Sequence, residues 1–321
     1  MKRHCDLLAI VLLIAGGLAS GFAAAEEALR INQIQFVGSH NSYKQAMHAA
    51  DFQALQAQNP QAAAALEYEH LPLDQQLDLG MRVLEIDLFY QSASGAFPVG
   101  HVQQIDMNSH CADLLDCLAQ VKHWSRAHPQ HVPIWLMFNL KDQVIDGLPE
   151  PEPFTAQALK QLDEVFTAEL AEQLIWPDSI VERRWPTLDD ARGKILLLLD
   201  EGGTKRDWYL KHSKPTMFAN APRQHPRAAV MVVNDPVSQQ QEIQQLVRAG
   251  FMVRTRADAN TVEARAGDTR RRQAAFSSGA QAVSTDYYLP ATHFGSNYQV
   301  SIDAVVQCNP VSAPQPCTVT E

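Results

Sequence analysis

The sequence lacks an excess of basic residues, because 26 Lys and Arg face 36 Asp and Glu and leave a formal net charge of −10. Binding to nucleic-acid phosphates requires a basic face, so this balance argues against DNA or RNA as a partner. It also argues against simple electrostatic docking on anionic lipid. The surplus of carboxylates does, however, leave oxygen ligands available for a cation.

Long apolar runs are scarce as well, and only the start of the chain contains one. Residues 1–25 begin with Lys2 and Arg3, continue with an apolar stretch and close with Ala23-Ala24-Ala25. This order is typical of a cleaved secretory signal peptide, and the stretch is short for a membrane span. We therefore expect a protein secreted or held in a periplasm, with a mature chain of residues 26–321.

Cysteine is rare, with four residues beyond the predicted cleavage site. An even number in an exported protein favours disulfides. We predict the short-range pairs Cys111–Cys117 and Cys308–Cys317, although other connectivities stay open. Neither pair has the C-x-x-C spacing of a zinc site.

Several familiar motifs are absent: the G-x-G-x-x-G turn, the P-loop and the G-x-S-x-G elbow. Their absence disfavours a dinucleotide-binding sheet, a P-loop NTPase and an α/β-hydrolase. There is also no internal repeat, low-complexity tract or linker. We therefore expect one domain, in which residues from about 301 to 321 form a C-terminal extension.

The chain does contain short apolar runs that alternate with helical patterns. Runs rich in Val, Ile, Leu and Phe fit strands buried on both faces, and they lie at 31–38, 82–90, 132–140, 194–200, 228–235, 251–258 and 282–287. Amphipathic helix candidates lie at 111–128, 154–170, 238–250 and 268–280. This alternation predicts a parallel sheet with crossover helices and suits a (β/α)8 barrel; a doubly wound open sheet is the alternative.

Polar residues follow the first two strand candidates, and in a barrel such positions carry the chemistry. The first run ends at Gly38 and presents His40 and Asn41. The second carries Glu85 and Asp87, which lie two residues apart and so share a face. Two carboxylates in an apolar strand require a cation or donors, and we favour a hard, oxygen-binding cation over a salt bridge, for which Arg82 is a candidate.

The next strand candidate and the loop before it add three residues. His101 follows a Pro-Val-Gly turn, and Asn139 and Lys141 share a face where the third run ends. Two imidazoles around a carboxylate-held cation suit phosphodiester cleavage, because one takes a proton from the nucleophile and the other gives one to the leaving oxygen. A zinc site with both imidazoles as ligands is the competing interpretation.

Later strand ends are less specific. Arg254 and Arg256 alternate on one strand candidate, so one of them could clamp a phosphate or pair with Asp258 or Asp286. Tyr287 follows the last run and either stacks on a substrate ring or packs in the core.

Several stretches resemble the secreted, calcium-dependent phosphoinositide phospholipase C family of bacteria and fungi. They run in the family's order from about residue 31 to 300: GSHNSY, LPLDQQLDLGMRVLEIDLFY, VGHV, CLAQVKHWSRAHPQHVPIWLMFNLKD, GFMVRTRADANTVEAR and GAQAVSTDYY. The resemblance implies an irregular TIM barrel, a bound Ca2+ and an inositol phospholipid substrate reached at a membrane surface. No obligate protein partner is evident.

The resemblance also implies roles for single residues. His40 matches the general base that acts on the inositol 2-hydroxyl, and His101 matches the general acid that protonates the diacylglycerol oxygen. Asn41, Glu85 and Asp87 match calcium ligands. The expected products are an inositol 1,2-cyclic phosphate and diacylglycerol. Because no basic cluster for ring phosphates is evident, unphosphorylated phosphatidylinositol or a glycosyl anchor is the expected headgroup.

One position departs from the family pattern. Related enzymes tend to place a further Glu where this chain has Asn139, which can ligate Ca2+ through its carbonyl oxygen but removes one negative charge. We therefore expect weaker calcium binding. Two alternatives stay open: a glycerophosphodiester phosphodiesterase or sphingomyelinase-D-like enzyme, and an exported lipid- or sugar-binding barrel that lost catalysis.

Overall fold

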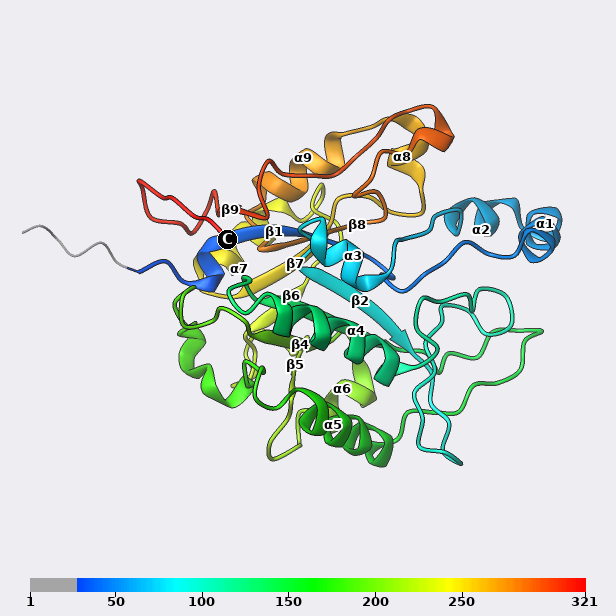
Figure 1. The fold of residues 1–321 in the computed structure, drawn as a ribbon, viewed down its shortest axis with the longest axis horizontal. Helices are drawn as coiled ribbons and strands as arrows, with labels where there is room; N and C mark the ends of the chain where they lie inside the picture. The colour runs from blue at the N-terminus through cyan, green and yellow to red at the C-terminus, as the bar shows by residue number, and fades with distance from the viewer. Residues whose placement is uncertain (1–27) are drawn as a thin grey trace, which may run out of the picture.

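Eight parallel strands form a nearly closed barrel with helices packed around it (Figure 1). The computed structural model describes residues 28–321, so the predicted signal peptide lies outside the described residues. The strands follow the order β5-β4-β3-β2-β1-β8-β7-β6, and β5 adjoins β6. Their bounds are β1 (Ile34–Ser39), β2 (Val83–Leu88), β3 (Ile134–Leu140), β4 (Ile195–Leu199), β5 (Met217–Ala219), β6 (Val230–Val232), β7 (Met252–Arg256) and β8 (Ala282–Thr285).

The helices lie outside the barrel or beyond its mouth, with α1 and α2 projecting farthest from it, at the right of Figure 1. Their bounds are α1 (Ala49–Gln58), α2 (Pro60–Ala65), α3 (Leu73–Asp78), α4 (Leu114–Ala127), α5 (Ala156–Leu170), α6 (Gly203–Tyr209), α7 (Gln240–Arg248), α8 (Val262–Ala266) and α9 (Arg270–Ser277). Short 3-10 turns occupy Ile31–Gln33, Pro177–Ser179, Val181–Arg183 and Thr292–Phe294. Among the described residues, no helix has the length and apolar character needed to cross a bilayer.

The predicted single-domain TIM barrel is therefore confirmed, and each of the seven predicted runs overlaps one strand. The sequence did not predict β5, because its three apolar residues stand alone between polar ones, whereas the equally short β6 lies in a longer apolar run at 228–235. It also did not predict α1, α2, α3, α6 or α8, which are short or lack a buried stripe.

Both predicted disulfides, Cys111–Cys117 and Cys308–Cys317, are present. The second anchors the C-terminal segment, whose strand β9 (Val306–Cys308) pairs antiparallel with β1. The C-terminus lies at the end of the barrel opposite α1 and α2 (Figure 1). Arg82 does not pair with Glu85 or Asp87; its guanidinium holds the Glu321 side chain instead, with Nη2 2.6 Å from Oε1.

The barrel interior changes from apolar to polar toward the C-terminal ends of its strands. On β2, Val83 faces an apolar cluster with Trp135, while Glu85 and Asp87, two and four residues later on the same face, are buried carboxylates. Strand register places Asp87 beside Asn139. The apolar half supplies the hydrophobic stabilisation of the interior, and the polar half is free to form a site.

Gly38 explains why β1 leads directly into this site. A Cβ at position 38 would lie 2.2 Å from Val83, so only glycine lets β1 approach β2 this closely. The following turn is fixed by Ser42, whose N–H donates to the Glu85 carbonyl at 2.8 Å and whose hydroxyl accepts from the Glu85 N–H at 2.8 Å. Asn41 adopts a left-handed φ of 49°, which Asn tolerates better than most residues. His40 and Asn41 are thereby held next to Glu85.

Candidate active site

A cavity of about 560 Å3 opens at the C-terminal ends of the barrel strands. It contains all the predicted site residues except one: His40, Asn41, Glu85, Asp87, His101, Asn139, Lys141, Arg254 and Arg256. They come from β1, β2, β3 and β7 and from the loops that follow them. The structure therefore brings together side chains up to 216 positions apart in the chain, the separation of His40 and Arg256.

Glu85 and Asp87 point into this cavity side by side, and Asn139 joins them. The Asn139 amide donates to Glu85 Oε1 at 2.7 Å and to Asp87 Oδ1 at 3.1 Å. Arg254 donates to the other Glu85 oxygen, and Lys141 Nζ lies 3.1 Å from Asp87 Oδ2. The two buried carboxylates are thus compensated by two fixed cations and one amide, which offsets the cost of burying their charge.

Asn41 is oriented by a single contact on its nitrogen. Its amide donates to the Tyr68 hydroxyl at 2.7 Å, so the side chain is fixed with the carbonyl oxygen as its remaining polar atom. Asn41 is almost fully buried at the edge of the cavity. A buried carbonyl oxygen of this kind suits a hard cation or a donor on a substrate.

The donor chemistry of the cavity fits calcium better than zinc. Within residues 28–321 no three His, Cys, Asp or Glu side chains converge as a metal-binding cluster. The oxygen-bearing set consists of Glu85 and Asp87 with the amides of Asn41 and Asn139. Calcium accepts carboxylate and amide oxygens together, whereas zinc prefers imidazole and thiolate ligands.

His40 is held by a carboxylate on one nitrogen and faces a guanidinium with the other. Its Nδ1 lies 2.8 Å from Asp286 Oδ1, and an Arg256 N–H points to its Nε2 at 3.2 Å. Arg256 also donates to Asp286 Oδ2 at 3.0 Å. Burial, and then the Arg256 charge, hold the pKa of His40 well below its usual value. A neutral imidazole with Nδ1 as its donor leaves Nε2 as the basic atom.

His101 has an analogous arrangement on the neighbouring loop. Its Nδ1 lies 3.1 Å from Asp106 Oδ2, and the other Asp106 oxygen accepts from Lys44 Nζ at 2.7 Å. Burial opposes ionisation of Asp106, but hydrogen bonds from His101 and Lys44 outweigh it and lower the pKa of this carboxyl. An ionised Asp106 keeps Nδ1 as the donor, so Nε2 is the ring nitrogen left to exchange a proton with a ligand in the cavity that His101 lines.

The residues that follow β4 line one wall of the cavity, which we call the far wall, and they include charged residues that the sequence did not single out. Asp200 and Glu201 follow β4, and Lys205 bridges Glu201 at 3.0 Å and Asp142 at 2.7 Å. Burial raises the pKa of Asp200 to about 7, although Arg254 opposes the shift. This wall offers carboxyl and ammonium groups suited to a polyhydroxylated ligand.

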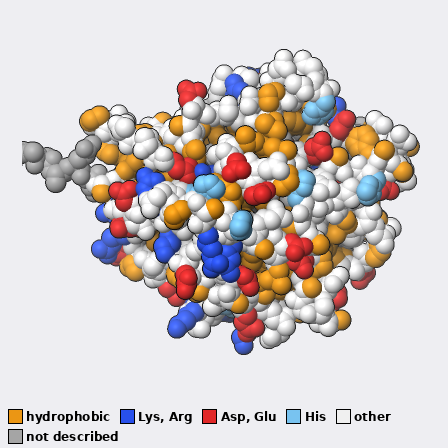
Figure 2. Space-filling view, viewed as in Figure 1, with side chains coloured by type: hydrophobic (Ala, Val, Ile, Leu, Met, Phe, Trp, Pro, Cys, Tyr) orange, Lys and Arg blue, Asp and Glu red, His pale blue; other side chains and the backbone are white. Residues whose placement is uncertain are grey.

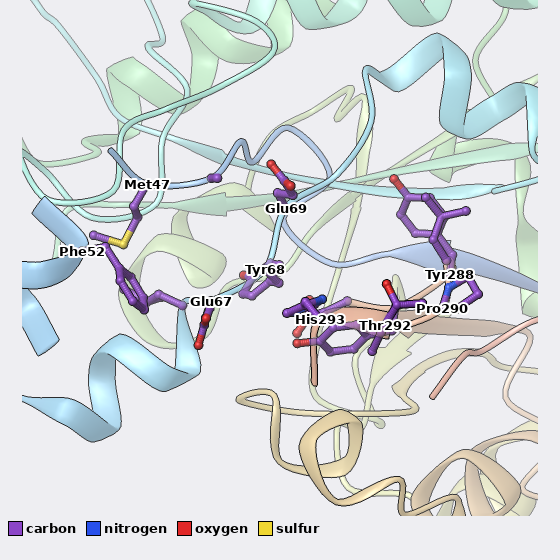
Figure 3. A pocket seen from close by; sticks show the side chains of 15 residues that line it. Met47, Phe52, Glu67, Tyr68, Glu69, Tyr288, Pro290, Thr292 and His293 are labelled. Atoms are coloured by element: carbon purple, nitrogen blue, oxygen red, sulfur yellow. The ribbon is translucent and has the colours of Figure 1, made fainter. Parts of the chain in front are cut away.

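Tyr287 is the predicted site residue that the structure does not bring to this cavity. It lines a second cavity of about 570 Å3 between the segment from Met47 to Glu69 and the loop after β8. Figure 3 shows Tyr68 and Glu67 across this space from Thr292 and His293. The two cavities meet at two contacts, His40 with Asp286 and Asn41 with Tyr68, because Asp286 and Tyr68 also line the second cavity.

The residues that hold the two histidines, Asp286, Asp106 and Lys44, were also missed in the sequence. Asp286 was considered only as an ion-pair partner of an arginine, and its contact with His40 was not foreseen. Asp106 and Lys44 lie in loops without periodicity, where no sequence pattern predicts that they form an ion pair. The inward position of Asp286 could have been predicted from the alternation of side chains along β8. Ser284 faces Arg254 inside the barrel, so Asp286, two residues later, faces inward as well.

This fold and this cavity define the class of protein. Parallel-barrel enzymes carry their active sites at the C-terminal ends of the strands, and here two histidines, each bonded to a carboxylate, share one cavity there with a second pair of carboxylates. The chain is a TIM-barrel enzyme in its architecture and in the position of its candidate site.

The family follows from comparison with known proteins. The family model of Ca2+-dependent phosphoinositide phospholipase C matches residues 29–100 and 94–310. The chain therefore belongs to this family of phosphoric diester hydrolases, whose cofactor is Ca2+. No curated protein sequence matches the chain.

Solved structures of low sequence identity share the fold. The Ca2+-dependent phosphatidylinositol-specific phospholipase C of Streptomyces antibioticus has a TM-score of 0.59 at 18% identity and covers 88% of this chain and 100% of its own. The calcium-dependent Pseudomonas sp. enzyme in its myoinositol complex has a TM-score of 0.58 at 18% identity, covering 88% of this chain and 96% of its own. The Listeria monocytogenes phosphatidylinositol-specific phospholipase C has a TM-score of 0.54 at 15% identity, covering 87% and 97%.

Proposed function

We propose that the chain is an exported phospholipase C that cleaves phosphatidylinositol-type lipids with calcium, by general base and general acid catalysis. The observation that supports this most is the pairing of both histidines with carboxylates, His40 with Asp286 and His101 with Asp106, around one cavity. Export agrees with the two disulfides, which persist in oxidising compartments.

The proposed reaction uses the two imidazoles in opposite protonation states. Nε2 of His40 takes the proton of the inositol 2-hydroxyl, and that oxygen forms a bond to the phosphorus. The bond from phosphorus to the diacylglycerol oxygen breaks, and His101 gives its Nε2 proton to this oxygen. The products are inositol 1,2-cyclic phosphate and diacylglycerol. The low pKa of His40 fits the base, which has to be neutral before the reaction.

Asn41, Glu85, Asp87 and Asn139 are the proposed calcium ligands. When bound, calcium stabilises negative charge on the phosphoryl oxygens. Because the Asn139 amide now donates to both carboxylates, its side chain has to turn its oxygen inward to serve as a ligand. Arg254, Arg256 and Lys141 line the same cavity as cations, and we assign them to contact with the substrate phosphate and ring.

The charges of the far wall favour an inositol ring without additional phosphates. Asp200 and Glu201 lie on this wall, and Lys205 is already bridged to Glu201 and Asp142. A ring phosphate placed here would meet carboxylates before a free cation, whereas ring hydroxyls can donate to them. Unphosphorylated phosphatidylinositol or a glycosyl anchor is therefore the proposed headgroup.

Phosphorus NMR on phosphatidylinositol vesicles, with calcium or with chelator, tests the function. The expected product is a cyclic phosphodiester that forms only with calcium. Release of phosphatidic acid or choline from other lipids would favour a phosphodiesterase of another type, and headgroup binding without turnover would favour a non-catalytic barrel. His40→Ala and His101→Ala should each lower turnover by about 10²-fold or more. His123→Ala, at an exposed position of α4, is the control and should retain activity.

A further inference from the structure

His70 is a buried histidine that contacts the turn carrying the proposed base. Figure 2 shows several histidines at the surface of one face of the molecule, whereas His70 is only 6% exposed, and His131 is the other buried histidine among residues 28–321. The Nε2 atom of His70 lies 2.7 Å from the carbonyl oxygen of His40. A carbonyl oxygen can only accept a hydrogen bond, so Nε2 of His70 carries the proton and donates it.

The other ring nitrogen of His70 is left without a partner. Its Nδ1 is buried and has no hydrogen-bond partner among the described residues. Burial lowers the pKa of His70 to about 4, so the ring is neutral at pH 7 and Nδ1 keeps its lone pair. A buried, unpaired acceptor lowers stability, and an apolar side chain would avoid this cost. The hydrogen bond to His40 is therefore what a histidine contributes at this position and an apolar residue does not.

The His40 carbonyl belongs to the peptide bond that joins His40 to Asn41. Because this bond is planar, the direction of the carbonyl helps to fix how both residues leave the turn. Asn41 has a φ of 49°, a left-handed conformation that a residue other than glycine adopts at a cost. Such a conformation persists where neighbouring groups hold it, and the hydrogen bond from His70 is one of the contacts that do so.

Tyr68, two residues before His70, holds the side chain of Asn41. Its hydroxyl accepts from the Asn41 amide at 2.7 Å. The N–H of His70 also donates to the Lys44 carbonyl at 2.9 Å, farther along the same turn. We call Tyr68 and His70 the clamp. One short segment between α2 and α3 thus bonds to the proposed base, to the proposed calcium ligand beside it and to the turn that follows them.

We propose that the clamp positions both the base His40 and the calcium ligand Asn41. His70 fixes the peptide bond between these two residues, and Tyr68 keeps the carbonyl oxygen of Asn41 available to calcium. This inference rests on the proposed function, in which His40 takes a proton and Asn41 binds calcium. Tyr68 and His70 are positioning residues, because neither of them lines the cavity that contains His40 and Asn41.

Steady-state kinetics of two His70 variants test the hydrogen bond to His40. His70→Leu keeps a side chain of similar size without a donor, whereas the amide of His70→Gln places an N–H donor near the position of Nε2. For His70→Leu, kcat on phosphatidylinositol should fall by about 10²-fold with a much smaller change in KM, because a small displacement of a reacting group costs about this much. His70→Gln should recover most of the loss. Equal losses in the two variants, or no loss in His70→Leu, overturn the proposal.

His131→Leu is the matched control for the removal of a buried histidine. Nδ1 of His131 lies 2.7 Å from the Val132 carbonyl, just before β3 and therefore at the end of the barrel opposite the candidate site. His131→Leu should lower the melting temperature and leave kcat unchanged. A fall in kcat as large as that of His70→Leu would show that lost stability explains both results, and it would overturn the proposal.

Calcium binding provides a measurement that does not depend on turnover. Tyr68→Phe removes the hydroxyl that fixes the Asn41 amide, and it should weaken calcium binding about tenfold in isothermal titration calorimetry, because groups that orient a metal ligand have effects of this size. Tyr288→Phe removes a neighbouring hydroxyl that accepts from the Leu71 N–H, and it should bind calcium as the native chain does. Equal binding by the native chain and Tyr68→Phe, or equal losses in both variants, overturns the proposal.

The clamp and the proposed function fail in different ways. If phosphatidylinositol is not cleaved but Tyr68→Phe still weakens calcium binding and Tyr288→Phe does not, the clamp stands and the proposed function falls. If the native chain cleaves phosphatidylinositol and His70→Leu does so equally fast, the function stands and the clamp falls. A native chain that does not bind calcium removes the role assigned to Asn41 and also overturns the clamp.

Discussion

His40 and Asp286 are separated by 246 positions in the chain, yet Nδ1 of the imidazole lies 2.8 Å from Oδ1 of the carboxylate. The contact joins the turn after β1 to the end of β8, which are neighbouring parallel strands. Arg256 closes the arrangement, since it donates to Asp286 and to Nε2 of His40. The ring orientation of His40 therefore depends on the charge of Asp286.

Asp286→Asn tests this dependence. An amide of the same shape accepts with one atom and donates with the other, so it no longer requires Nδ1 to be the donor. We expect kcat on phosphatidylinositol to fall by about 10²-fold and KM to change much less. The substitution affects the orientation of the base His40 but leaves the contacts with the headgroup in place. Steady-state kinetics measure the split. An unchanged kcat would show that Asp286 does not position the base.

Lys44 and Asp106 form a buried ion pair behind His101, and both side chains are fully inaccessible to solvent. Lys44→Met leaves Asp106 with one partner, which should cost about 3–5 kcal/mol of unfolding free energy at pH 7. The native pKa of Asp106 is lowered, so its contribution is present above the unfolded pKa and is lost as pH falls through the folded value. The cost of Lys44→Met should therefore shrink in acid.

Urea unfolding of Lys44→Met at pH 7 and pH 3 measures this change. Lys44→Met/Asp106→Asn is the matched second variant, and it should be less destabilised than the sum of the single changes, because it removes the unpaired charge. A cost that is equal at both pH values would contradict the role assigned to the pair.

Asn139→Glu tests whether the missing carboxylate limits calcium affinity. Glu removes the amide donor that bridges Glu85 and Asp87 and adds a third negative charge at this place. Without calcium the variant should melt at a lower temperature than the native chain, and with calcium it should gain more. Isothermal titration calorimetry should show tighter calcium binding, since ligand charge tunes affinity.

Asn139→Gln is the control for the size of the side chain, because it differs from Asn139→Glu only in charge. It should not tighten calcium binding. The idea that charge is limiting fails if the Glu and Gln variants bind calcium equally.

Much of the barrel could be predicted from the sequence, because strands buried on both faces consist of unbroken runs of apolar residues. Such a run at residues 195–199 leaves few alternatives. The strand at 217–219 has three residues and is defined by its pairing with β4, a relation that the local sequence does not contain. Strand existence was thus predictable where burial alone sets the residue type.

The site was predictable to the extent that its residues stand on strands. Glu85 and Asp87 share a face by the period of two, and the structure places both in one cavity. Tyr287 follows Asp286, the residue that contacts His40, but it lines only the second cavity, so its contact with a substrate ring stays a prediction. The ion pair of Lys44 and Asp106 depends on the conformation of two loops, and loop sequences have no periodicity from which such a contact could be predicted.

Asp258 holds the backbone of Asp286, the residue that contacts the proposed base His40. Because Asp258 is buried, the free energy of unfolding depends on pH. It accepts from the Asp286 N–H at 2.8 Å and from the Thr285 hydroxyl, and it is fully buried. Burial, and then the neighbouring Asp286, raise the pKa of Asp258 to about 7. The unfolded pKa is about 3.9, so the protonated carboxyl is favoured in the folded chain. Its contribution is fully present below the unfolded pKa and is lost as pH rises through the folded value.

Asp258→Asn removes this titration. Its one amide oxygen can still accept from the Asp286 N–H, and its NH2 group can donate to the Thr285 hydroxyl, which rotates to accept. The stability of the native chain relative to the variant should therefore fall between about pH 4 and pH 7, by up to about 4 kcal/mol. Urea unfolding across this range measures the difference. Asp303→Asn, at an exposed position, controls for the loss of one carboxylate. A difference between native chain and Asp258→Asn that stays constant from pH 4 to 8 would show that Asp258 has the same charge in both folded and unfolded chains.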